Sequence, residues 1–233
     1  MPMLRAVIFD FNGIILDDEP LHYRAMKEAV SSLGIDLAEA EYLEEFLPFD
    51  DWSCLSAICE KHGRNLTEAE RERALFLKSS GYARLLKGSY PVFPGAAELV
   101  AEAAARYPLA IATGARREEV CQTLETTGLA RYFTVVVAAQ DFTLGKPHPE
   151  SFLLALERLN ARLDGRLPAI RPAECLVIED SVAGIEGARK AGMSCLAVAN
   201  TYPREKLTGA NRVVDSLREV DVRSLEALFG EDP

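Results

Sequence analysis

Short apolar runs recur along the chain, and helical segments separate most of them. Runs that are apolar at almost every position are typical of parallel strands covered by helices on both faces. The expected strands are residues 4–9, 109–112, 134–138, 176–178, 195–198 and 212–214. Because strands that alternate with helices require right-handed crossovers, the pattern predicts the α/β class, with a doubly wound, Rossmann-like parallel sheet.

The intervening segments have the spacing of amphipathic helices. We expect helices at residues 95–106, 116–126, 150–159 and 182–191. Pro94 and Pro149 precede two of them, as expected for a residue that suits the first turn. In the third of these helices, four apolar side chains are expected to face the core: Phe152, Leu153, Leu156 and Leu159.

One long stretch, residues 17–90, interrupts this alternation and contains no convincing strand. A helix is expected to begin at Pro20, since apolar residues follow it at helical spacing. Thr67 and Glu70 have the spacing of a capping box and predict a second, long helix towards Leu86. We therefore predict a helical cap domain at residues 17–90, inserted into an α/β core of residues 1–16 and 91–233.

Composition limits the classes of partner. The 233 residues are 48% apolar and carry a net charge of −10, which is typical of a globular protein and unfavourable for binding nucleic acid. Five scattered cysteines indicate reduced thiols, and no secretory signal or membrane-spanning run is visible. We expect a cytoplasmic protein, a monomer or weak dimer, with no membrane or nucleic-acid partner.

Polar residues follow four of the predicted strands. Asp10 follows the first strand, Thr113 the second, Lys146 comes shortly after the third, and Glu179 and Asp180 follow the fourth. A single aspartate at a strand end is more often a helix cap or a solvated carboxylate. In an open parallel sheet, however, ligands bind beyond the carboxyl ends of the strands, and all these residues are expected at that edge.

This combination of residue types favours phosphoryl transfer. A carboxylate can attack phosphorus and form an aspartyl phosphate. Carboxylates from two strand ends can hold Mg²⁺, which prefers oxygen ligands. A lysine and a hydroxyl can bind the oxygens of the transferred group.

Four motifs carry a resemblance to a known family: D-F-N-G at residues 10–13, I-A-T-G at 111–114, G-K-P-H-P-E at 145–150 and I-E-D-S-V-A-G-I at 178–185. They resemble the motifs of the haloacid dehalogenase-like hydrolases. The segment D-D-E-P-L-H, residues 17–22, resembles the subgroup with a helical cap, which includes β-phosphoglucomutase and many sugar-phosphate phosphatases. The resemblance covers about residues 4–215.

The resemblance implies a role for each of these residues. Asp10 would be the nucleophile, Thr113 and the Gly114 amide would bind phosphate, and Lys146 would neutralise both the phosphate and the nucleophile. The implied Mg²⁺ ligands are Asp10, the Asn12 backbone carbonyl, Asp180 and, as a further or outer ligand, Glu179. The implied substrate is a small phosphorylated metabolite.

Asn12 departs from the family pattern, because phosphatases of this family usually carry a second aspartate there. That aspartate protonates the leaving group and later deprotonates water, whereas an amide cannot move a proton at neutral pH. Three alternatives follow: a phosphatase with another proton donor, a different reaction such as that of a phosphosugar mutase, or a weak or inactive anion-binding protein. His22, Asp17 and Asp18 are possible substitute donors.

The cap is expected to determine the substrate. Lys78 resembles a family lysine that reaches into the site, although a solvated helix lysine is the alternative interpretation. Trp52 is either an apolar wall of the substrate pocket or part of the cap core. β-Phosphoglucomutase has an arginine for a second phosphate near the position of Asp50 and Asp51, and these carboxylates count against mutase activity. The leading hypothesis is a Mg²⁺-dependent phosphatase.

Overall fold

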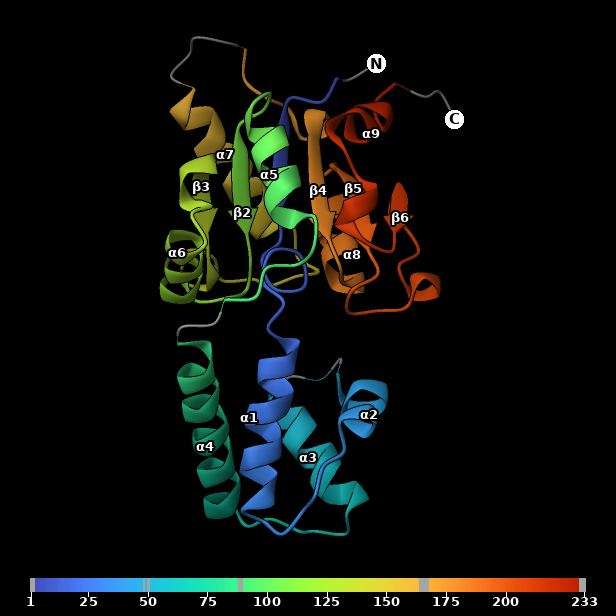
Figure 1. The fold of residues 1–233 in the computed structure, drawn as a ribbon. Coiled ribbons are helices and arrows are strands. Elements are labelled where there is room, and N and C mark those ends of the chain that lie inside the picture. The colour runs from blue at the N-terminus through green and yellow to red at the C-terminus, as the bar shows by residue number, and fades with distance from the viewer. Residues whose placement is uncertain (1–2, 48, 50, 88–89, 164–167, 231–233) are drawn as a thin grey trace. The chain divides into compact units, whose positions relative to one another are not determined.

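The computed structural model describes residues 3–47, 49, 51–87, 90–163 and 168–230 (Figure 1). The chain forms two compact units. The first comprises Met1–Asp17 and Pro91–Pro233, and the second comprises Asp18–Tyr90. The second unit begins one residue later than the predicted insert, and its role as a cap stays a prediction.

The first unit is built on a six-stranded parallel sheet, which confirms the predicted α/β class. Its strands are β1 (Ala6–Phe9), β2 (Leu109–Ala112), β3 (Phe133–Val137), β4 (Cys175–Glu179), β5 (Ser194–Val198) and β6 (Arg212–Val214). Both ends of each predicted strand lie within two residues of the ends of the observed strand. The strand order is β3-β2-β1-β4-β5-β6, with all pairs parallel.

The order of the strands reverses beside β1. Strands β2 and β3 extend to one side of it, and β4, β5 and β6 extend to the other. Phe9, the last residue of β1, lies in register between Ile111 of β2 and Ile178 of β4. The carboxyl ends of β1 and β4 therefore meet at the topological switch point, where open α/β sheets bind their ligands.

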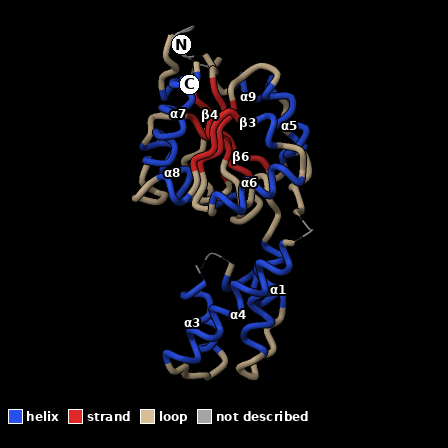
Figure 2. The backbone as a smooth tube through the Cα atoms, turned by 90° about the vertical axis from the view of Figure 1, so that its left-hand side faces the viewer, coloured by secondary structure: helices blue, strands red, loops and turns tan. Residues whose placement is uncertain are grey.

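Helices cover both faces of this sheet (Figure 2). They are α5 (Ala96–Ala104), α6 (Arg117–Thr126), α7 (Glu150–Arg162), α8 (Val182–Lys190) and α9 (Val222–Ala227). Short 3-10 turns occupy Ala130–Tyr132, Ala139–Asp141, Pro172–Glu174, Arg204–Lys206 and Leu217–Glu219. Helices α7 and α8 lie on one face, where Phe152 and Ile185 join a buried cluster with Ala6 and Ile8 of β1, and α5 and α9 lie on the other.

The prediction that Leu153 faces the core is wrong. Its side chain is 41% exposed, whereas Phe152, Ala155, Leu156 and Leu159 are buried. The inward stripe of α7 thus runs through positions 152, 155, 156 and 159, and the small Ala155 takes the inward place that was assigned to Leu153. Neighbouring residues of a helix point about 100° apart, so Leu153 leaves the stripe that Phe152 defines.

The second unit is helical, and no strand occurs among its described residues. Its helices are α1 (Glu19–Ser31), α2 (Glu39–Glu41), a π-helical turn (Tyr42–Phe46), α3 (Asp51–Lys61) and α4 (Glu68–Leu86). The predicted capping box is confirmed, since the Thr67 hydroxyl accepts from the Glu70 amide and the Thr67 amide donates to the Glu70 carboxylate. A core that includes Met26, Leu55 and Ile58 packs these helices together. None of the chain's described helices is long and apolar enough to cross a bilayer.

Candidate active site

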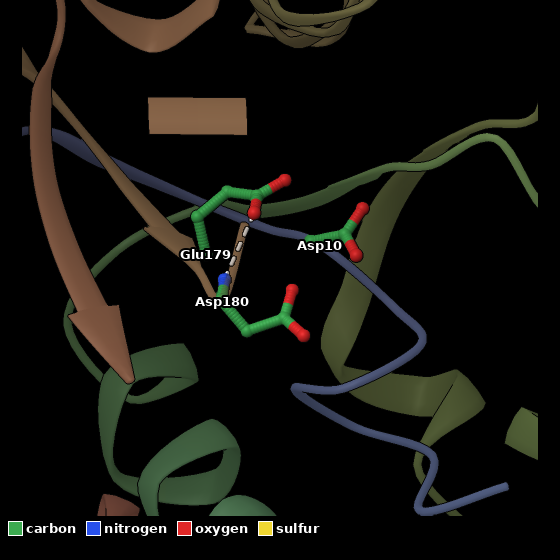
Figure 3. Close-up of side chains that lie close together, drawn as sticks. All are labelled: Asp10, Glu179 and Asp180. Carbon is green, nitrogen blue, oxygen red and sulfur yellow. Dashed lines mark hydrogen bonds between the residues drawn. The ribbon is translucent and has the colours of Figure 1, made fainter. Parts of the chain in front are cut away.

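Three buried carboxylates meet at the switch point of the sheet. Asp10 follows β1, and its amide donates to the Ile178 carbonyl of β4 at 2.9 Å. Glu179 ends β4, and Asp180 follows it. Each residue offers an oxygen within 4.8 Å of the others, and Figure 3 shows their carboxylate groups gathered in a common space. The structure thus brings together three residues that the sequence placed at the ends of two different strands.

Lys146 lies among these carboxylates. It is in the loop between β3 and α7, and its Nζ lies 2.5 Å from Asp10 Oδ1 and also contacts Glu179 Oε1. The ammonium also lies 5.0 Å from the centre of the Phe152 ring. A solvated loop lysine is therefore excluded, and Lys146 bridges the predicted nucleophile and the end of β4.

Glu179 is fixed by a dense set of hydrogen bonds. Its Oε2 accepts from the Asp180 and Ser181 amides, both at 2.8 Å, and from the Ser181 hydroxyl at 2.9 Å. Ser181 in turn caps α8 by accepting from the Gly184 amide at 3.0 Å. A Cβ at Gly184 would lie 1.9 Å from the Glu179 carboxylate, so only glycine allows this close approach.

The electrostatics of the site show excess negative charge. Burial raises the pKa of Asp10 to about 7, with Lys146 opposing and Glu179 adding to the effect. Burial, together with Glu179 and Asp10, also raises the pKa of Asp180 well above its usual value. For Glu179, burial is outweighed by Lys146 and Ser181, so its pKa is lowered. One ammonium does not compensate three buried carboxylates, and the site favours a further cation.

Two residues that follow β5 form hydrogen bonds to residues of the site. The Thr201 hydroxyl donates to Asp180 Oδ2, and the Asn200 side chain donates to the Gly13 carbonyl at 2.7 Å. Gly13 has a φ of +76°, and a Cβ there would lie 1.9 Å from Asp180 Oδ2. Sequence reasoning missed Asn200 and Thr201, although two polar residues close behind a buried strand were a usable signal.

The Asn12 side chain points to a carboxylate. Its Nδ2 donates to Glu119 Oε1 of α6 at 3.4 Å, and both residues are half-buried. No local pattern indicates this pair, because 107 residues separate its members. An amide at position 12 suits this neighbour, whereas an aspartate there would place two carboxylates side by side.

Thr113 and Gly114 lie at the same edge of the sheet, after β2. Thr113 is buried, its amide donates to the Val137 carbonyl of β3 at 3.0 Å, and its hydroxyl accepts from the Ala115 amide at 3.0 Å. Gly114 is exposed. Because β2 is the neighbour of β1, this turn lies beside the strand that leads to Asp10.

The residues at the switch point fit Mg²⁺. Asp10 and Asp180 supply hard carboxylate oxygens that lie close together, and a bound cation would offset the cost of burying their charges. Both oxygens of Glu179 are already engaged by Lys146, Ser181 and the backbone. Glu179 therefore suits the role of an outer ligand better than that of a direct one.

The second unit contains a polar cluster of its own. Lys78 is only 2% exposed, which excludes a solvated helix lysine. Its Nζ lies 2.7 Å from His22 Nδ1 and 2.6 Å from Asp51 Oδ1. His22 Nε2 lies 3.1 Å from Asp18 Oδ2, and the Tyr82 hydroxyl donates to the same oxygen at 2.6 Å. Two predicted residues, His22 and Lys78, are thus directly paired.

Trp52 is half-exposed and is not part of a buried core. The Arg71 guanidinium lies over its ring, 4.6 Å from the centre. Two carboxylates were expected to repel a second phosphate. One of them, Asp51, has a side chain that is 51% exposed, and it pairs with Lys78. The other, Asp50, lies outside the described residues.

A doubly wound sheet with three buried carboxylates and a lysine at its switch point is the architecture of an α/β enzyme. The family model "haloacid dehalogenase-like hydrolase" matches residues 4–192, and the chain belongs to this family of hydrolases.

The sequences of named relatives match most of the chain. It is 31% identical to the phosphorylated carbohydrates phosphatase of Thermotoga maritima, over 82% of each chain. It is 30% identical to the fructose-1-phosphate phosphatase YqaB of Escherichia coli, over 83% of this chain and 95% of that protein. Among solved structures, β-phosphoglucomutase from Clostridium difficile superimposes with a TM-score of 0.74, 25% identity and 98% coverage of both chains.

Proposed function

We propose that the protein is a Mg²⁺-dependent phosphatase of small phosphorylated metabolites, acting through an aspartyl phosphate on Asp10. The observation that carries this proposal is the contact of Lys146 with Asp10 beside Asp180 at the switch point. Two of its relatives, a phosphorylated carbohydrates phosphatase and a fructose-1-phosphate phosphatase, support a sugar phosphate as the substrate class.

The site residues of the first unit would have different roles in this reaction. An Asp10 oxygen attacks phosphorus, and the ester oxygen leaves with the rest of the substrate. Lys146 offsets the negative charge that the phosphoryl group brings to the carboxylate. Thr113 and the Gly114 amide hold the remaining phosphoryl oxygens, since they directly follow β2, the strand beside β1. Water then releases phosphate from Asp10.

Asp10, the Asn12 backbone carbonyl and Asp180 would hold Mg²⁺, with Glu179 behind them. The ion would neutralise phosphoryl oxygens and fix their orientation. The hydrogen bond from Thr201 orients the Asp180 carboxylate for this task, and Gly13 leaves room for it.

The second unit would recognise the rest of the substrate. Lys78 and His22 offer polar groups, and the half-exposed ring of Trp52 offers an apolar surface. Aromatic faces and convergent polar groups are what a small polar metabolite with a carbon skeleton requires. The identity of the sugar is expected to depend on these residues rather than on the sheet.

Release of inorganic phosphate from a panel of sugar phosphates and an aryl phosphate, with Mg²⁺ and with a chelator, tests the proposal. Turnover that needs Mg²⁺ and is abolished in Asp10→Asn is expected. If the wild-type protein binds Mg²⁺ but hydrolyses no phosphate ester, the proposal is wrong and an anion-binding protein takes its place.

The likeness to β-phosphoglucomutase supports a phosphosugar mutase as the second candidate. Such a reaction needs a second phosphate to bind, and Asp51 would repel it unless Lys78 compensates the charge. Incubation of the same panel without other acceptors distinguishes the two. A phosphatase releases inorganic phosphate, whereas a mutase converts one sugar phosphate into its isomer and releases little.

A further inference from the structure

Two adjacent residues after β5 each contact a different part of the proposed metal site. Thr201 donates to the Asp180 carboxylate, which follows β4, and Asn200 donates to the turn that follows β1. Strand β4 lies between β5 and β1 in the sheet, so the pair joins segments from three strand ends. The role of these contacts rests on the proposed function, in which Asp10, the Asn12 carbonyl and Asp180 hold Mg²⁺.

The contact of Thr201 limits how Asp180 can bind a cation. The Thr201 hydroxyl donates to Asp180 Oδ2. Gly13 lies against the same oxygen, since a Cβ at position 13 would be 1.9 Å from it. Two neighbours thus cover Oδ2, and Asp180 is expected to present Oδ1 to an ion.

The other two carboxylates of the site are also engaged by protein donors. Lys146 Nζ lies 2.5 Å from Asp10 Oδ1. At Glu179, Lys146 contacts Oε1, and the Ser181 amide and hydroxyl donate to Oε2. Asp10 and Asp180, the two proposed carboxylate ligands, therefore each have one oxygen engaged by the protein. The arrangement suits an ion that takes one oxygen from each of them.

Asn200 fixes the turn that carries the third proposed ligand, the Asn12 carbonyl. Its side-chain amide donates to the Gly13 carbonyl at 2.7 Å, and the Gly13 amide donates to the Leu16 carbonyl at 3.0 Å. In a trans peptide the N–H and the carbonyl point in opposite directions. The Asn12 carbonyl, which shares a peptide group with the Gly13 amide, therefore points away from Leu16. Hydrogen bonds on both sides of Gly13 hold it in this orientation.

Mg²⁺ and Ca²⁺ require different things from such a site. Mg²⁺ binds oxygen at about 2.0–2.1 Å in a strict octahedral geometry, and it usually keeps several waters. Ca²⁺ takes about 6–8 oxygens at about 2.3–2.6 Å, and it often binds both oxygens of a carboxylate. Carboxylates that each offer one oxygen, on ligands that are held in place, therefore favour the smaller ion.

We propose that Asn200 and Thr201 are positioning residues that raise the affinity of the metal site for Mg²⁺ relative to Ca²⁺. Thr201 prevents Asp180 from binding an ion through both oxygens. Asn200 prevents the Asn12 carbonyl from moving outwards to the longer distance that Ca²⁺ requires. Both residues act through the ligands, and they make the site selective without contacting the ion.

Isothermal titration calorimetry of the metal-free chain with Mg²⁺ and, separately, with Ca²⁺ tests this role. Thr201→Val removes the hydroxyl and keeps a similar shape. Its dissociation constant for Mg²⁺ should rise about 10- to 100-fold, the usual effect of losing a group that orients a metal ligand. Its dissociation constant for Ca²⁺ should stay the same or fall, because Asp180 Oδ2 becomes available to the larger ion. Asn200→Ala tests the other member of the pair and should also weaken Mg²⁺ binding more than Ca²⁺ binding.

Two further variants distinguish this role from a general effect on folding. Thr201→Ser retains the hydroxyl and should restore the preference for Mg²⁺. Thr127→Val is the matched control, because Thr127 is also half-buried and its hydroxyl donates to the Thr123 carbonyl at 2.7 Å, at the end of α6. It should leave both affinities unchanged. Damage to the fold would weaken the binding of both ions and would not change the ratio of their affinities.

The Mg²⁺ dependence of phosphate release separates this inference from the proposed function. Thr201→Val should need about tenfold more Mg²⁺ for half-maximal activity and should approach the wild-type kcat at saturating Mg²⁺. A wild type that binds Mg²⁺ but hydrolyses no phosphate ester contradicts the proposed function, and the ratio of the two affinities still decides the role of the pair. An active, Mg²⁺-dependent wild type whose ratio is unchanged in Thr201→Val and in Asn200→Ala contradicts only the inference.

Discussion

At the scale of single residues, Lys146 provides the sharpest test of the site. It contacts Asp10 and Glu179 and is the ammonium that offsets their charge. Without it, the incoming phosphate would meet uncompensated carboxylates. We expect Lys146→Met to lower kcat by at least about 10²-fold, the usual effect of removing one group that stabilises charge in a transition state.

Steady-state phosphate release with saturating Mg²⁺ measures this effect. Lys190→Met is the matched control, because Lys190 is a partly exposed lysine of α8 that pairs with Glu186 on the surface. Circular dichroism of both variants establishes that they are folded. A kcat for Lys146→Met equal to that of the control would show that the lysine is structural.

The sequence was sufficient to predict those site residues that directly follow or end a strand. Asp10, Glu179 and Asp180 were predicted to meet because parallel strands end at one edge, and the structure brings them together. It could not reach Glu119 or the contact of Tyr82 with Asp18, since both depend on how distant helices pack. Motifs and strand ends locate the buried carboxylates, whereas contacts between distant helices depend on tertiary packing that the local sequence does not describe.

At the scale of elements, the capping box at the start of α4 leads to a prediction about stability. Thr67 and Glu70 satisfy each other's backbone amides there. Thr67→Ala removes one of these bonds and should lower the free energy of unfolding by about 1 kcal/mol. For a chain of this size that corresponds to a fall in melting temperature of about 2–4 °C.

Thr67→Ser is the control, because it keeps the hydroxyl and should melt close to the wild type. Phosphatase activity at low temperature should be unchanged in both variants, since Lys78 lies well inside the helix. A large loss of activity in Thr67→Ala would contradict this expectation and would mean that activity depends on the capped end of α4.

The elements themselves were predicted with uneven success. Continuous apolar runs located all six strands, because burial on both faces leaves a clear pattern. Helix α3, Asp51–Lys61, was not predicted, and Leu153 was assigned to the wrong side of α7. In both cases the apolar spacing is ambiguous, and the choice is made by neighbouring elements that the local sequence does not describe.

At the scale of the whole molecule, the proposed metal site should link stability to Mg²⁺ through Asp10. Burial raises its pKa from 3.8 to about 7, opposed by Lys146 and assisted by Glu179. A carboxyl group with a raised pKa in the folded state stabilises the fold fully below its unfolded value of 3.8. That contribution is lost as the pH rises through about 7, because the folded protein must then hold an unfavourable buried charge.

Mg²⁺ should reverse this loss, because it binds the ionised form and supplies the missing positive charge. We therefore expect the rise in melting temperature between chelator and saturating Mg²⁺ to be larger near pH about 8 than near pH about 6, by several degrees. Differential scanning calorimetry of the metal-free and metal-loaded protein at both pH values measures it. Asp10→Asn removes one of the two carboxyl groups whose pKa values are raised, so its Mg²⁺ response should be weaker and should depend less on pH, with the remaining dependence due to Asp180. An equal stabilisation of the wild type at both pH values would mean that Asp10 does not bind the ion.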